Sequence, residues 1–151
     1  MGQDAREEIN VEPKGTGSKN YGWKLTEGKQ CRDQFNAADY PQSCAGTSLA
    51  DVTEPVHDYP HGSCNNCIIG GYVYRGSTIP SLQGYYLFGD NGSNRVWAMA
   101  WGGPTTGRCA APLDLSAQLS LNGNITSFGE DANGEVYITT SAGNLYRIDA
   151  K

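Results

Sequence analysis

Short apolar and aromatic runs, bounded by turn residues, follow one another along most of the chain. The clearest stretch lies between Ile68 and Met99, where Gly, Pro, Asn and Ser separate the runs. Runs of this length and composition predict β-strands, because amphipathic helices need longer periodic segments. The predicted strands are Glu7–Val11, Pro55–Tyr59, Ile68–Tyr74, Tyr85–Gly89, Arg95–Trp101, Leu113–Leu121, Ile125–Glu130, Glu135–Thr140 and Asn144–Ile148.

One predicted hairpin recurs further along the chain. Gly84 and Gly134 each precede an aromatic–apolar run, and Asn94 and Asn144 each precede the returning strand, so both pairs are 50 residues apart. A fixed period of roughly 40–50 residues built from short strands is typical of a β-propeller blade. We therefore expect an all-β fold, part of a propeller. Because a single blade cannot bury its own faces, we expect it to pack on further blades or on copies of itself.

The strand pattern divides the chain into three parts. Residues 1–50 are expected to hold the end of a preceding blade and a long polar loop, residues 51–101 one blade, and residues 102–151 the C-terminal blade. Each of the two blades is expected to contain four strands. The polar stretch from Lys24 to Ser48 is predicted to be a surface loop, and loops of that length are often functional.

Composition narrows the possible functions. The chain has 151 residues, which suits one modest domain, with 20 Gly, 7 Pro and a net charge of −5. The acidic balance argues against nucleic-acid binding, since no basic stripe is available for phosphates. No apolar run approaches the roughly 18 residues of a membrane span, and none follows Met1 as in a signal peptide.

The five cysteines leave several interpretations open. Cys31 and Cys44 bracket the polar loop, Cys64 and Cys67 form a CxxC, and Cys109 is separate. A structural zinc site usually needs four ligands, and no second pair accompanies the CxxC. A redox pair usually lies at a helix N-terminus, which Asn65-Asn66 before a strand does not predict. Disulfides of an exported protein are the preferred interpretation, with one cysteine left over.

Several segments, taken in order, resemble the soluble quinoprotein sugar dehydrogenases, also called the glucose/sorbosone dehydrogenase family. The two cysteines that follow NYGW, Cys31 and Cys44, are similar to the branch that includes the Hedgehog-interacting protein. The resemblance spans essentially the whole chain. The segments that carry it are GQDAREEIN (Gly2–Asn10), NYGW (Asn20–Trp23), Glu27-Gly28, GGYVYRG (Gly70–Gly76), IP…GYYLFGD…NRVW (Ile79–Trp97) and SFGEDANGEVYITTSAGNLYRID (Ser127–Asp149).

The resemblance implies a six-bladed propeller with pyrroloquinoline quinone (PQQ) and calcium at its axis. In the family, a histidine general base takes the proton of the sugar C1 hydroxyl while a hydride passes to the quinone. The chain corresponds to roughly the C-terminal third to half of these proteins, and the catalytic histidine lies outside it. The resemblance and the cysteines together predict an extracellular or periplasmic protein that is inactive as this chain alone.

The resemblance also suggests residues for the two cofactors. Glu8 and Tyr21 match calcium ligands, a carboxylate and a main-chain carbonyl, although three extra residues separate them here. Calcium prefers such oxygen ligands. The quinone carries three carboxylates and needs cations. The family's lysine falls at Gly92 and its two arginines at Asn124 and Thr126, so none of the three cations is present.

Three further residues are candidates for the cofactor site. His57 and His61 flank Tyr59, where the chain is expected to approach the propeller axis, so Tyr59 and His61 are assigned to the central cavity. An equally simple interpretation makes them loop residues with satisfied hydrogen bonds. Asp90 is the third candidate, and its negative charge would oppose the quinone.

Three functions remain open. The chain is a fragment of a PQQ-dependent sugar dehydrogenase, or a non-catalytic propeller that binds a partner, or a small protein that completes a propeller by self-association. The missing cations and extra cysteines favour the binding module. Two N-x-S/T sequons, Asn91-Gly92-Ser93 and Asn124-Ile125-Thr126, have meaning only in a protein secreted by a eukaryote, and chance occurrence is the preferred interpretation.

Overall fold

The structure, a computed structural model, describes residues 2–3, 5–23, 25–31, 51–63, 67–100 and 111–150. These residues form eleven short β-strands and one 3₁₀ turn, Pro80–Leu82, and include no α-helix. The chain divides into two compact units, Met1–Gly62 and Ser63–Lys151. The predicted all-β class is therefore confirmed.

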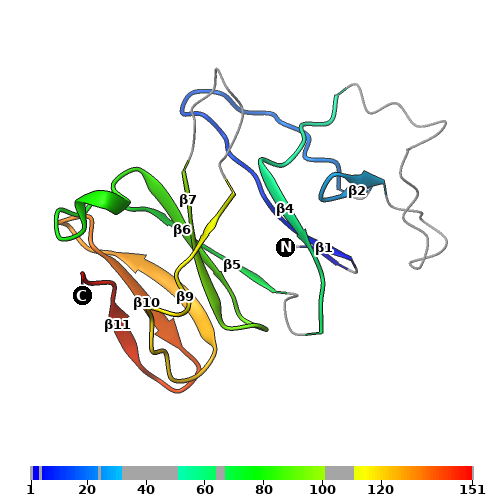
Figure 1. The fold of residues 1–151 in the computed structure, drawn as a ribbon. Helices are drawn as coiled ribbons and strands as arrows, with labels where there is room; N and C mark the ends of the chain where they lie inside the picture. The colour runs from blue at the N-terminus through cyan, green and yellow to red at the C-terminus, as the bar shows by residue number, and fades with distance from the viewer. Residues whose placement is uncertain are drawn as a thin grey trace. The chain divides into compact units, whose positions relative to one another are not determined.

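The first unit contains two small antiparallel pairs (Figure 1). β1 (Arg6–Ile9) pairs with β4 (His57–Pro60), and β2 (Thr26–Glu27) pairs with β3 (Gln30–Cys31). Burial alternates along β1 with the period of two expected of a strand with one covered face. The β2–β3 hairpin begins inside the stretch that the sequence predicts to be a loop, which is a correction.

The second unit contains two antiparallel sheets (Figure 1). The first sheet has the order β5 (Ile68–Val73), β6 (Tyr85–Asp90), β7 (Arg95–Ala100) and β8 (Leu113–Asp114). The second has the order β11 (Leu145–Arg147), β10 (Val136–Thr140) and β9 (Ile125–Glu130). Up-and-down antiparallel sheets of this size are what a partial propeller contains.

A single apolar cluster joins these two sheets. Leu87, Val96, Ile125, Val136 and Ile138 have no exposed surface, and they come from both sheets. Branched side chains on strands pack well against a facing sheet, and burial of each contributes roughly 1.5–3 kcal/mol. The full set of buried cluster members is Tyr74, Leu87, Val96, Ala98, Ile125, Phe128, Val136, Ile138 and Ile148.

Strand grouping differs from the prediction at two places. β4 pairs with β1 and does not join the sheet of β5. β8 is only two residues long and completes the first sheet, so the predicted strand Leu113–Leu121 does not open the second one. Asp114 lies opposite Trp97 and forms an ion pair with Arg95, which fixes β8 on β7. The second sheet therefore has three described strands instead of four.

The two repeated glycines adopt the same backbone conformation. Gly84 has φ of 82° and Gly134 has φ of 79°, just before β6 and β10 respectively. Residues with a Cβ rarely adopt this conformation, so glycine is required by both hairpins. Positions 50 residues apart are therefore structurally equivalent where the first strand of each hairpin begins.

The offset changes in the second strand of each hairpin. Leu87 lies opposite Ala98, and Tyr137, 50 residues after Leu87, lies opposite Arg147, which is only 49 residues after Ala98. The turn between β10 and β11 is one residue shorter. Asn94 at φ 55° therefore corresponds to Gly143 at φ 81°, and its predicted equivalence to Asn144 is wrong by one position.

Several predictions are not tested by the structure, some of them because they concern residues outside the described part of the chain. Cys44, Cys64 and Cys109 lie outside the described residues, so the disulfide pairing stays a prediction. Cys31 is buried on β3, and the Cys67 N–H donates a hydrogen bond to Asp90. The boundaries 1–50, 51–101 and 102–151 and the six-blade count also stay predictions. No helix in the described part is long and apolar enough to cross a membrane.

Candidate functional site

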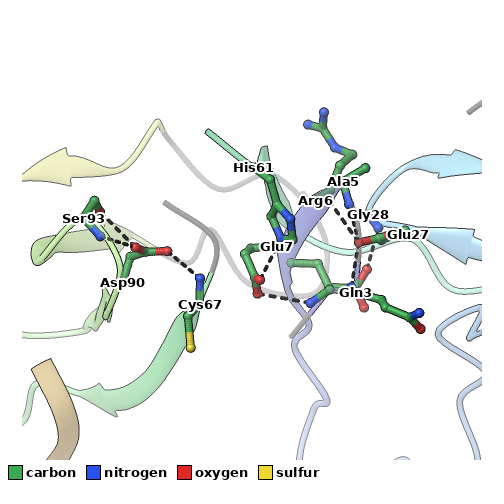
Figure 2. Close-up of polar contacts among 12 residues, drawn as sticks. Gln3, Ala5, Arg6, Glu7, Glu27, Gly28, His61, Cys67, Asp90 and Ser93 are labelled. Carbon is green, nitrogen blue, oxygen red and sulfur yellow. Dashed lines mark hydrogen bonds and ion pairs between the residues drawn. The ribbon is translucent and has the colours of Figure 1, made fainter. Parts of the chain in front are cut away.

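The first unit holds a histidine against a fully buried carboxylate (Figure 2). Glu7 on β1 lies opposite Tyr59 in the β1–β4 register, and His61 follows β4 directly. Glu7 is 0% exposed, and its Oε1 lies 2.9 Å from His61 Nε2. Its Oε2 accepts a hydrogen bond of 3.1 Å from the Gly2 N–H. Both carboxylate oxygens therefore have partners, which is the condition for burying such a group.

A second buried carboxylate fixes the segment that leads into β1. Glu27 is 2% exposed, and its Oε1 accepts the backbone N–H groups of Gln3, Ala5 and Arg6 at 2.7, 2.9 and 3.1 Å (Figure 2). Several backbone N–H groups that converge on one anion form a strong site for it. Glu27 thereby positions the segment that directly precedes Glu7.

The opposite face of the β1–β4 pair carries an ion pair. Arg6 Nε lies 2.6 Å from Asp58 Oδ2, which also accepts the Lys29 N–H at 3.1 Å. Glu8 lies directly opposite Asp58, and like charges in that position repel each other. The Gly28 N–H, 2.9 Å from Glu8 Oε2, and the Arg6 guanidinium offset this repulsion.

The pairing with Glu7 gives the His61 ring a defined orientation. An ionised carboxylate only accepts hydrogen bonds, so Nε2 carries the hydrogen and Nδ1 of the neutral ring is an acceptor. The His61 side chain is 16% exposed, which leaves it partly accessible. An imidazole held in this way can accept a hydrogen bond or a proton from a hydroxyl group. His57 on β4 is half-buried, and this burial lowers its pKa, an effect that the charge of Asp58 partly offsets.

We expect Glu7→Gln to lower the free energy of unfolding by about 2 kcal/mol, because it removes a charge-assisted hydrogen bond in a buried setting. A double-mutant cycle with His61→Gln should give a coupling energy of about 1 kcal/mol. Urea unfolding followed by circular dichroism measures both values. Glu12→Gln, on an exposed loop, is the control and should change little. Additive effects of the two substitutions would contradict an energetic interaction between Glu7 and His61.

The side chains of the two predicted calcium ligands, Glu8 and Tyr21, make separate hydrogen bonds, and their shared calcium site stays a prediction. Glu8 is half-buried on β1, and its carboxylate accepts hydrogen bonds from the Gly28 N–H and from Asn10 Nδ2. The Tyr21 hydroxyl donates to Glu12 Oε2 at 2.6 Å, which raises the pKa of Tyr21. No cluster of three or more His, Cys, Asp or Glu side chains in the described part is arranged to hold a metal ion.

The other candidates lie in different units. Tyr59 is half-buried on β4, with its ring centroid 6.2 Å from that of His57. Asp90 ends β6 in the second unit and is 0% exposed. Its Oδ1 accepts the N–H and the hydroxyl of Ser93 at 2.7 and 3.0 Å, and its Oδ2 accepts the Cys67 N–H at 3.1 Å (Figure 2). Asp90 therefore closes a turn with its own carboxylate.

Sequence reasoning missed Glu7 and Glu27. The signal for Glu7 was present, since Glu7 and Ile9 alternate with Glu8 and so share the buried face of β1. The same alternation turns Glu8, the predicted calcium ligand, to the other face. Glu27 belongs to the Glu27-Gly28 segment of the resemblance, but its burial gave no signal, because its partners are backbone N–H groups more than 20 residues away.

Comparison with known proteins indicates which family the chain is related to. No family model matches the chain. The HIPL1 protein of Arabidopsis thaliana is 35% identical over 169 residues, covering 98% of this chain and 23% of that protein. The HIPL2 protein of the same plant is 32% identical with the same coverage, and the Hedgehog-interacting protein of Mus musculus is 38% identical over 97 residues, or 56% of this chain. The chain is related to the sugar-dehydrogenase-like family, close to the Hedgehog-interacting proteins.

A solved structure agrees with this relationship at the level of fold. A crystal structure of glucose dehydrogenase matches all of the chain and 40% of its own length, with a TM-score of 0.67 and 17% identity. The chain spans about a quarter of each plant HIPL protein, at 23%.

The turn after β6 and the start of β9 hold the positions that the resemblance assigns to the cations that bind the quinone carboxylates. Asn91 Nδ2 donates to the Ile125 carbonyl at 2.7 Å, and Asn124 Nδ2 donates to the Asn91 carbonyl at 2.8 Å. Thr126 Oγ1 lies 2.9 Å from Thr139 Oγ1. These groups are neutral, and their polar atoms already bind one another. This donor set, next to the Asp90 carboxylate, does not fit the three carboxylates of the quinone.

Proposed function

We propose that this chain forms part of a glucose/sorbosone dehydrogenase-like propeller that acts as a binding module and does not oxidise sugars with a quinone. The turn after β6, which holds Asp90 and Asn91, and the neighbouring Asn124 before β9 carry this proposal. At the positions that the resemblance assigns to the quinone-binding lysine and arginines, the chain has Gly92, Asn124 and Thr126.

The energetic argument concerns the carboxylates of the quinone. A hydrogen bond to a charged group contributes roughly 1.5–3 kcal/mol, and three cations would supply several of them. The amides of Asn91 and Asn124 carry no charge, and one N–H of each already donates to a backbone carbonyl, so they do not replace the missing cations. The carboxylate of Asp90, although hydrogen-bonded, adds charge of the same sign as the ligand. Tight binding of the quinone is therefore disfavoured at this turn.

The rest of the propeller belongs to the same proposal. The longer relatives imply further blades, six in total by resemblance, with this chain supplying two sheets and a β1–β4 pair. We propose an extracellular or periplasmic location, with Cys31 paired to Cys44. The expected partners are the remaining blades or further copies of the chain. The net charge of −5 makes nucleic acid an improbable ligand.

The second candidate is a sugar dehydrogenase, and the His61–Glu7 pair favours it. A carboxylate-oriented imidazole 2.9 Å from Glu7 is suited to binding a sugar hydroxyl. In this candidate the full-length protein would hold PQQ, which supplies the hydride acceptor, together with calcium, and the catalytic base lies outside this chain. His61 and Tyr59 would then help to orient the substrate, and the isolated chain would be inactive.

We expect the chain to show no saturable binding of PQQ at micromolar concentrations with calcium present, measured by quenching of tryptophan fluorescence. It should also reduce no dye when glucose is added. The matched variant restores the family pattern with Gly92→Lys, Asn124→Arg and Thr126→Arg together, and it should bind the quinone more tightly because it supplies three cations. Micromolar binding by the natural chain would overturn the proposal. The second candidate would be established by glucose-dependent dye reduction in a longer protein that carries this chain together with the remaining blades.

A further inference from the structure

The two sequons lie side by side and are linked through their own amides. Asn91-Gly92-Ser93 forms the turn after β6, and Asn124-Ile125-Thr126 begins β9. Asn91 Nδ2 donates to the carbonyl of Ile125, the middle residue of the second sequon. Asn124 Nδ2 donates in turn to the carbonyl of Asn91. The side-chain amides of Asn91 and Asn124, the asparagines of the two sequons, therefore belong to one small hydrogen-bond network.

The two acceptor asparagines differ in exposure. Asn91 is half-buried, and Ser93 of its sequon bonds through both its N–H and its hydroxyl to Asp90, which is fully buried. Asn124 and Thr126 are exposed. The side chain of Ile125 between them is fully buried in the apolar cluster. The second sequon is thus anchored in the fold while its acceptor faces solvent.

The backbone of the second sequon is also held independently of its acceptor side chain. The Asn124 N–H donates to Ser141 Oγ at 2.9 Å, and the Ile125 N–H donates to Asn94 Oδ1 at 3.2 Å. A group added to the Asn124 amide would leave both bonds in place. The acceptor of the first sequon is less accessible, because Asn91 is half-buried and its Nδ2 lies 2.7 Å from the carbonyl of the core residue Ile125.

We propose that Asn124 is the N-glycan acceptor of this chain in a eukaryotic secretory pathway, and that the folded protein carries no glycan on Asn91. The donor is an oligosaccharide linked to a lipid pyrophosphate. Asn124 Nδ2 forms a bond to the anomeric carbon of the first sugar, one amide hydrogen leaves as a proton, and the lipid pyrophosphate leaves with the electron pair of the broken C–O bond. The remaining amide N–H can still donate to the Asn91 carbonyl.

The similar proteins come from a plant and from mammals, which are eukaryotes and have the secretory pathway that N-glycosylation requires. The inference does not depend on whether the protein binds a quinone. It rests on the exposure of Asn124, on the burial of Ile125 and on the hydrogen bonds that surround each acceptor.

The test is secretion of the full chain, behind a cleavable signal peptide, from cultured mammalian cells. Intact mass before and after treatment with peptide N-glycanase should show one glycan, and the enzyme should leave an aspartate at position 124. Asn124→Gln and Thr126→Val should each remove the glycan, whereas Thr126→Ser should retain it because the sequon is preserved. Asn91→Gln and Ser93→Ala should leave the glycan unchanged.

A secreted chain without a glycan on Asn124 would overturn the proposal, and so would a glycan on Asn91. Where secretion is poor, protein extracted from the cells and resistant to limited proteolysis is analysed in the same way, so that only folded chain is counted. A co-expressed glycoprotein of known occupancy confirms that the cells add glycans.

Discussion

Gly71→Ala is expected to lower the free energy of unfolding of the second unit by about 3 kcal/mol, the upper part of the range for overpacked sites. Gly71 lies in β5, where the register against β6 shifts between Ile69 and Tyr72. A Cβ atom on Gly71 would lie 1.8 Å from the carbonyl oxygen of Leu87 and 3.3 Å from the ring of Phe128. The Leu87 carbonyl is backbone in the centre of the sheet, so it cannot turn away as a flexible side chain would.

The measurement is urea unfolding of the full chain followed by circular dichroism. Gly129→Ala is the matched control, since Gly129 also lies within a strand, β9, and a Cβ there would have no atom within 4 Å. That control should be neutral, or more stable by up to about 1 kcal/mol, because alanine restricts the unfolded chain. Equal stability of the Gly71 and Gly129 variants would show that the β5–β6 contact is not as close as described.

Local sequence was sufficient to find most of the strands. Residues 125–130 form a strand with the predicted bounds, and Ile68–Tyr74, Tyr85–Gly89 and Arg95–Trp101 agree with β5, β6 and β7 to within a residue. Aromatic and β-branched residues between glycine turns carry this information locally. The repeat of Gly84 and Gly134 was equally readable, because a positive φ requires glycine in both hairpins.

Strand pairing was less predictable, because it depends on residues far apart in the chain. β4 lies closer in sequence to β5 than to β1, yet it pairs with β1. β8 is two residues long and is fixed on β7 by the ion pair between Arg95 and Asp114. Neither interaction has a local signal, since each needs a partner about 20 or 50 residues away.

The candidate site shows the same division between local and distant information. His61 was identified from its sequence context, and the structure gives it a partner in Glu7. The alternation of β1 separates buried Glu7 from Glu8, and this was available in the sequence. The burial of Glu27 was not, because a carboxylate is normally exposed unless partners satisfy it. Its partners are backbone groups of a segment that folds over it only in three dimensions.

We expect Glu135→Gln to remove much of the acid sensitivity of the second unit. Glu135 precedes β10 and is 5% exposed. Its carboxylate accepts the hydroxyl of Tyr74 at 2.6 Å, the hydroxyl of Thr78 at 2.8 Å, and the N–H groups of Ser77 and Thr78 at 3.0 Å. These bonds, above all the one from Tyr74, lower its pKa from 4.5 to about 2. The carboxylate thus links the end of β5 to the second sheet.

The direction of the pH effect follows from this pKa. Because the pKa of Glu135 is lower in the folded chain than in the unfolded chain, ionised Glu135 favours folding. Its contribution is complete above the unfolded pKa of about 4.5, and it is lost as the pH falls toward the folded value of about 2. Glutamine keeps one acceptor oxygen but has no charge, so the variant should be less stable at pH 7 and should lose less stability on acidification.

Urea midpoints measured at pH 7, 5, 4 and 3 give both curves. They should converge at low pH, because protonated Glu135 in the natural chain and glutamine in the variant are both neutral. Glu130→Gln is the control, since Glu130 pairs at 3.2 Å with Arg75, whose side chain is 61% exposed, and surface pairs of this kind contribute little. Parallel curves for the natural chain and the Glu135 variant would mean that the charge of Glu135 does not contribute to the free energy of unfolding. Convergence would assign the difference between the two curves at neutral pH to this one carboxylate and its four donors.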